Sequence, residues 1–149
     1  MAVGDMKTQE FIDRLDETRI VAEIGAAERR TSGEIRIFVS HCKVEDAMAQ
    51  ARRHFEKLGM TRTRHRNAVL IYFAPRARKF AVIGETGIHE KCGTVFWEEA
   101  VAEIGEHLRA ERFTDAVLHA VRKVGNLLAE HFPAEPGDGN ELPDEILHD

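Results

Sequence analysis

The sequence predicts a single α/β domain in which parallel and antiparallel strands share one sheet. Helix-like and strand-like patterns alternate along the chain, and one strand-like run is apolar on both of its faces. A connection short enough for a hairpin follows that run. The 149 residues, 43% of them apolar, supply one ordinary hydrophobic core. We expect this domain at residues 1 to 133 and an acidic, loosely ordered tail at residues 134 to 149.

An amphipathic helix is predicted over residues 16 to 30. Its apolar side chains recur at helical spacing, either Asp16 or Thr18 is the candidate N-cap, and Gly33 follows as a stop. The segment 11 to 15 also contains apolar residues. It forms either the first turns of this helix or a separate short helix, and the sequence pattern leaves both possibilities open.

The next segments build the predicted sheet. Residues 34 to 40 alternate apolar, mostly β-branched side chains, as a strand does, and residues 44 to 58 show a second amphipathic helix. Residues 67 to 74, NAVLIYFA, are apolar without alternation, which is typical of a central strand covered on both faces. The short segment 75 to 78 then leads to a third strand, KFAVIG, at residues 79 to 84, and so short a connection joins antiparallel neighbours.

Two more helical patterns follow before the tail. The first begins near Phe96 and continues to Leu108, and the second begins with Thr114 as candidate cap and ends before Pro133. The tail after it is acidic and rich in Pro and Gly, so we expect few contacts to hold it.

Charge and composition favour no particular partner. The formal net charge of −5 comes from the tail, because the rest of the chain carries 21 basic and 20 acidic residues. Basic residues crowd the stretch from Arg52 to Lys79, but the predicted topology divides them between two ends of the sheet. Tyr72 and Phe73 lie inside the apolar strand, where no base could stack on them. We therefore expect no nucleic-acid partner.

The sequence shows no sign of secretion or of a membrane span. Two cysteines, Cys42 and Cys92, are too few for a disulfide-stabilised secreted domain. No apolar run approaches the roughly 20 residues that cross a bilayer, and the first residues lack the pattern of a signal peptide. We expect a cytoplasmic protein with both cysteines reduced.

Several segments together resemble the TPM domain family, named for plant thylakoid-lumen, photosystem-repair and nicotinic-receptor auxiliary proteins, in its cytosolic bacterial version. The resemblance extends over residues 16 to 133, and its most specific parts are TSGEI and a glycine-containing loop formed by Gly84, Glu85, Gly87 and Ile88. The segments that carry it are ERRTSGEIRIFV (28 to 39), RNAVLIYFAPRARKFAVIGETGIHEKCG (66 to 93), FW (96 to 97) and NELPDEI near the end.

The resemblance implies a three-layer α/β/α sandwich with a central mixed sheet. It also implies three possible activities, since thylakoid relatives are associated with acid phosphatase activity, some bacterial relatives with divalent cations, and animal relatives with receptor modulation. Where thylakoid-type members have paired aspartates after the first helix, this sequence reads TSGE. That departure weakens the phosphatase expectation.

The predicted topology brings charged side chains together at one end of the sheet. A right-handed crossover makes the first two strands parallel, and the hairpin makes the third antiparallel to the second. The starts of strands one and two therefore meet the exit of strand three. Gathered there are three acids and a histidine, Glu34, Glu85, His89 and Glu90, and three arginines, Arg62, Arg64 and Arg66.

These residue types suit a hard cation beside an anion. Carboxylates and loop carbonyls are ligands that Ca²⁺ and Mg²⁺ prefer, and arginine binds phosphate or carboxylate. We expect Glu34, Glu85, His89 and Glu90 to bind Ca²⁺ or Mg²⁺. The three arginines form a possible anion site. In the alternative, Glu34 and Glu85 only pair with these arginines as surface ion pairs. An unidentified protein partner is a further possibility.

Other chemistries find less support. A zinc set of His41, Cys42, His89 and Cys92 is disfavoured, because the two pairs fall at opposite ends of strands about 26 Å long. Serine occurs only twice and no nucleophile–histidine–acid pattern is visible, so no catalytic residue is assigned. A weak metal-dependent acid phosphatase acting on phosphomonoesters remains the alternative function.

Overall fold

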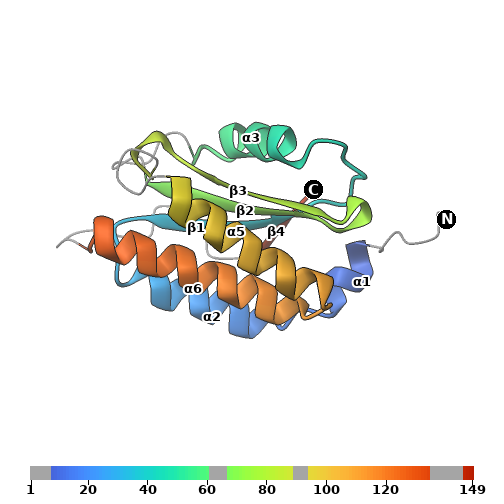
Figure 1. Cartoon of the computed structure of the whole chain (residues 1–149), viewed down its shortest axis with the longest axis horizontal. Coiled ribbons are helices and arrows are strands. Elements are labelled where there is room, and N and C mark those ends of the chain that lie inside the picture. The colour runs from blue at the N-terminus through green and yellow to red at the C-terminus, as the bar shows by residue number, and fades with distance from the viewer. Residues whose placement is uncertain (1–7, 61–66, 89–93, 135–145) are drawn as a thin grey trace.

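A four-stranded mixed sheet forms the centre of the molecule. The computed structural model describes residues 8–60, 67–88, 94–134 and 146–149. Within them the strand order is β3-β2-β1-β4, with β1 parallel to both β2 and β4 and with β2 antiparallel to β3 (Figure 1). The strands are β1 (Glu34–Val39), β2 (Ala68–Ala74), β3 (Lys79–Gly84) and β4 (Ile146–His148).

Helices cover both faces of this sheet. The helix α3 lies on one side, while α2 and α6 lie on the other, so the layers read α/β/α (Figure 1). α5 packs against α6 on that second side. The bounds are α1 (Thr8–Asp13), α2 (Glu17–Glu28), α3 (Ala47–Lys57), α5 (Thr94–Arg109) and α6 (Phe113–His131). The predicted single α/β domain with a mixed sheet between helical layers is confirmed.

Side-chain alternation divides the core into two halves. Successive residues of a strand point to opposite faces. Ile35 and Ile37 on β1 join the larger cluster under α2, α5 and α6, whereas Phe38 joins the smaller cluster under α3. β2 contributes to both halves, and each of its seven residues is buried. The absence of alternation in NAVLIYFA therefore has the cause that the sequence predicts: neither face of this strand meets water.

The helix caps agree with the sequence in one case and differ in another. Asp16 caps α2, since its carboxylate accepts a hydrogen bond from Arg19 N at 3.2 Å, and α1 is a separate short helix. The expected cap at Thr114 is wrong, because α6 begins at Phe113 after Arg112. The Thr114 hydroxyl instead accepts from Asp16 N at 3.1 Å, which joins the start of α6 to the start of α2.

The end of the chain corrects the expectation of a loosely ordered tail. Residues 146 to 148 form β4 and pair in parallel with residues 37 to 39 of β1. Ile146 packs against the larger core cluster and Leu147 against the smaller one. Residues 135 to 145 lie outside the described part of the chain, so the expectation stays a prediction for them. Strand pairing anchors the last residues despite their acidic surroundings in the sequence.

Among the helices that the structure describes, none has the length and apolar character needed to cross a membrane. The longest, α6, has 19 residues, but it carries charged side chains on its outer face, for example Arg122 and Glu130.

Candidate functional site

The segment Thr31–Ser32–Gly33 fixes the start of β1 against the end of α6. The Thr31 hydroxyl lies within hydrogen-bonding distance of the carbonyl oxygens of Leu128 and Phe132, and it accepts from Gly33 N at 3.0 Å. A Cβ on Gly33 would lie 3.0 Å from the Leu128 side chain and 3.1 Å from the Asn67 carbonyl oxygen. A larger residue at position 33 would therefore crowd Leu128 and the start of β2. The TSG part of TSGEI acts as structural support for the residue that follows.

That following residue, Glu34, is almost fully buried, and so is Glu85. Glu34 is 2% exposed and is the register partner of Ala68 across β1 and β2. Glu85 is 5% exposed, and its backbone N–H donates to Ala68 O at 2.9 Å. Its carboxylate oxygen Oε1 accepts from Ala68 N at 3.0 Å. The two carboxylates thus belong to segments on either side of Ala68, and we call this the carboxylate edge.

The segment after β3 explains the other family motif. A Cβ on Gly84 would meet the Ile88 side chain at 3.0 Å, and Ile88 is 1% exposed. Residues 86 to 88 are helical, and Ile88 N donates to Glu85 O at 2.9 Å. The tight turn after Gly84 therefore buries Ile88 and directs Glu85 toward the start of β2.

The structure describes two of the predicted site residues, Glu34 and Glu85. They lie on the two sides of Ala68, at the same end of the sheet. His89, Glu90 and the three arginines at 62, 64 and 66 lie outside the described residues. Within the described residues, three or more His, Cys, Asp or Glu side chains are nowhere grouped so as to hold a metal ion. The predicted metal site therefore stays a prediction.

The opposite end of β1 carries a second polar cluster, which sequence reasoning missed. The Asp149 carboxylate accepts hydrogen bonds from His41 N at 2.6 Å and from the Ser40 hydroxyl at 2.8 Å. Burial alone would raise the pKa of Asp149, but these hydrogen bonds, with one from the Cys42 thiol, outweigh burial and lower it. These hydrogen bonds hold Asp149 against the residues that follow β1.

Two aromatic groups lie near this cluster, on the α3 side of the sheet. The His54 ring stacks on Phe38, with 4.2 Å between ring centroids, and lies 5.8 Å from Tyr72. Burial lowers the pKa of His54, because its charged form loses hydration. Burial likewise raises the pKa of Tyr72, which is fully buried. Both pKa shifts favour the neutral form, which suits side chains that pack against other rings.

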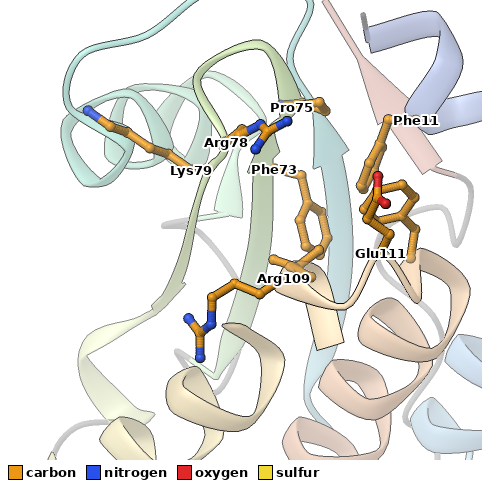
Figure 2. Close-up of a pocket in the computed structure, with 9 residues that line it drawn as sticks. Phe11, Phe73, Pro75, Arg78, Lys79, Arg109 and Glu111 are labelled. Atoms are coloured by element: carbon orange, nitrogen blue, oxygen red, sulfur yellow. The ribbon is translucent and has the colours of Figure 1, made fainter. Parts of the chain in front are cut away.

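A cavity of about 370 Å³ opens at this same end of the sheet, on the other face (Figure 2). Three buried rings, Phe11, Phe73 and Phe113, form its inner wall, with ring centroids 5.6 Å apart for Phe11 and Phe73 and 5.0 Å for Phe11 and Phe113. Its rim is charged and exposed, with Arg78, Lys79, Arg109 and Glu111. This cavity lies far from the carboxylate edge, at the opposite end of β2.

Comparison with known proteins now identifies the class and the family. The mixed sheet between helical layers, with TSGEI and GETGI at one edge, defines an α/β/α sandwich domain. The TPM domain model matches residues 6–127, and the chain belongs to the TPM domain family. The resemblance deduced from the motifs is thereby confirmed.

Solved structures similar to this chain include those of two bacterial proteins. The NMR structure of BA42 protein from the psychrophilic bacterium Bizionia argentinensis is 30% identical, with a TM-score of 0.83 and 99% of each chain covered. The N-terminal domain of cg2496 protein from Corynebacterium glutamicum is 17% identical, with a TM-score of 0.51 over 74% of this chain and 67% of that one, and it supports the fold alone. No curated protein shows significant similarity to the chain.

Proposed function

We propose that this TPM-domain protein is a divalent-cation-binding module whose carboxylate edge binds Ca²⁺ or Mg²⁺. The observation that supports this most is the position of two buried carboxylates, Glu34 and Glu85, 2% and 5% exposed, on the two sides of Ala68. Carboxylate oxygens are ligands that Ca²⁺ and Mg²⁺ prefer. Two carboxylates at one edge of the sheet therefore favour a cation site.

The chemistry of this edge suits a hard ion. Calcium takes six to eight oxygen ligands, and magnesium takes about six and keeps several waters. The hydrogen bond from Ala68 N occupies one acceptor position on Glu85, and a carboxylate offers about four. In this proposal, His89, Glu90 and loop carbonyls after Ile88 complete the ligand set. Arg62, Arg64 and Arg66 would receive a phosphate or carboxylate beside the ion.

The test is a titration of protein first freed of metal with EDTA. Ca²⁺ and Mg²⁺ are added separately at constant ionic strength, which separates binding from screening. We expect the melting temperature to rise by about 5 to 10 °C at an ion concentration near 100 times Kd, since such an excess stabilises by about 2.7 kcal/mol. Backbone NMR shifts should concentrate at residues 33 to 35, 67 to 68 and 84 to 88.

Matched variants locate the site. Glu85→Gln keeps an oxygen that accepts from Ala68 N but removes the charge, so it should retain the apo fold and lose the ion response. Glu34→Gln should act in the same way. Glu45→Gln, an exposed glutamate just before α3, is the control and should respond like the parent. If the arginines alone neutralise the carboxylates, neither ion will shift the parent and the proposal fails.

The same samples distinguish binding from hydrolysis. Incubation with p-nitrophenyl phosphate and Mg²⁺ should give no release above the buffer rate under this proposal. Release that disappears in Glu85→Gln would instead make the carboxylate edge a metal-dependent phosphatase site.

A further inference from the structure

The cavity beside Phe73 has the composition of a ligand site. Its volume of about 370 Å³ falls inside the roughly 300 to 1,000 Å³ range of small-molecule sites. Phe11, Phe73 and Phe113 come from α1, β2 and α6, so three elements far apart in the sequence converge on it. Leu108 and Pro75 complete an apolar lining. Such a lining accommodates a flat, apolar body.

The charges at its rim favour an anion. Glu111 pairs with Arg14 at 3.6 Å, so its charge is already matched. Among the residues that the structure describes, Arg78 and Arg109 have no acidic partner. Figure 2 shows the Arg78 guanidinium beside Pro75 at the rim, whereas Lys79 and Arg109 extend away from the rings. Arg78 is therefore the cation placed to bind a charged group of the ligand.

The backbone at the rim is held in an unusual conformation. Arg78 has φ 54° and Glu111 has φ 58°, and in the described part of the chain these are the non-glycine residues with positive φ. Such positions cost about 1 kcal/mol or more and concentrate at ligand sites. Arg78 follows the turn η2 (Pro75–Ala77), and Glu111 lies between α5 and α6. Both conformations direct charged residues to the same cavity.

We propose that this cavity binds a small organic anion with an aromatic body. The ligand ring packs in the cavity against the wall formed by Phe11, Phe73 and Phe113, and its anionic group binds the Arg78 guanidinium, with Arg109 adding positive charge. Arginine binds carboxylates and phosphates through the same paired N–H donors, so the two head groups share this chemistry. The site lies at the opposite end of β2 from the carboxylate edge, and it does not depend on cation binding there.

A panel of four compounds tests each part of the proposal by NMR titration. We expect 3-phenylpropionate to shift the amides of residues 73, 78, 111 and 113 in a saturable way. Propionate lacks the ring and 3-phenylpropanol lacks the charge, so each should bind at least about tenfold more weakly. Phenyl phosphate is the fourth compound, and its affinity relative to 3-phenylpropionate tells which anionic group the site prefers.

Paired variants supply the matched control. Arg78→Asn removes the guanidinium but tolerates positive φ, and it should weaken binding about tenfold. Arg76→Asn removes an exposed arginine of the same turn that does not line the cavity, and it should leave binding unchanged. Glu111→Asn removes a negative charge from the rim and frees Arg14 from its ion pair, so it should tighten binding severalfold.

Three outcomes would overturn the proposal. The first is the absence of saturable shifts with either ring-bearing anion. The second is equal binding of 3-phenylpropanol, which would show that the cavity selects only apolar bodies. The third is equal weakening by Arg76→Asn and Arg78→Asn, which would show general attraction to a basic surface.

Discussion

The two ends of β2 hold charge in opposite ways. At the Ala68 end, Glu34 and Glu85 are buried within the sheet framework, whereas at the Ala74 end Arg78 and Arg109 remain in water above buried rings. Burying a charge costs several kcal/mol unless another group compensates for it, while an exposed charge costs almost nothing. The stability of the first end therefore depends on how its charges are compensated, whereas the stability of the second end depends on how its rings pack. One strand about 20 Å long supports both.

The largest effect is expected between the two ends. Leu70 is fully buried in the middle of β2, under α3. Leu70→Asp would bury an unpaired carboxylate without any of the partners that Glu34 and Glu85 have, and we expect it to unfold the domain, a loss of more than about 4 kcal/mol. Circular dichroism measures the result. Leu70→Met keeps the volume and should cost less than about 1.5 kcal/mol; a folded Leu70→Asp protein would contradict the central position of β2.

The next effect concerns the end of the sheet at Asp149. Removing residues 146 to 149 deletes β4, with the half-buried Ile146 and Leu147, and exposes the edge of β1. We expect a loss of about 2 to 3 kcal/mol, since full burial of one such side chain contributes about 1.5 to 3 kcal/mol. Urea unfolding measures it. An unchanged midpoint would show that β4 does not contribute to stability.

A substitution at Gly33 probes how tightly the carboxylate edge is built. In Gly33→Ala the new methyl group would lie 3.0 to 3.1 Å from Leu128 and from the Asn67 carbonyl oxygen. We expect a cost of about 1 to 3 kcal/mol, the usual range for overpacking. Gly59→Ala is a poor control because Gly59 has φ 73°, so Ala134→Gly, at an exposed position, serves instead. Equal melting temperatures for parent and Gly33→Ala would show that this edge adapts easily.

A smaller effect should appear only in acid. The pKa of Asp149 is lower folded than its ordinary value of 3.8, so its hydrogen bonds stabilise the fold above that value and are lost as pH falls through the folded pKa. Asp149→Asn has no proton to gain there. The difference in melting temperature between parent and Asp149→Asn should therefore be constant above about pH 5 and change below about pH 4. Parallel curves down to pH 2 would remove this role of Asp149.

The smallest effect is expected at the rim of the cavity. Arg78→Asn should change the free energy of unfolding by less than about 0.5 kcal/mol, because the side chain is exposed and asparagine tolerates positive φ. Urea unfolding at two salt concentrations measures it. A loss above 1 kcal/mol would mean that Arg78 stabilises the fold, and its effect on ligand binding could then not be separated from folding.

The helices, the directions of β1, β2 and β3, and the placement of Glu34 and Glu85 at one end of the sheet follow from sequence patterns, whereas the three layers were implied by the family resemblance. Hydrophobic periodicity distinguishes helices from strands, and the length of a connection decides whether neighbouring strands run parallel or antiparallel. The motifs TSGEI and GETGI indicated the family on the same local information. These features follow from residues close together in the chain.

The position of residues 146 to 149 and the existence of the cavity depend on long-range packing. β4 is three residues long, too short for a period to be read, and its pairing with β1 spans more than 100 positions. Phe11, Phe73 and Phe113 each look like ordinary core residues of their own elements, and no spacing relates them. They meet because α1, the last residues of β2 and the start of α6 lie at the same end of the sheet. Contacts between residues distant in sequence leave no periodic pattern, so packing alone creates that site.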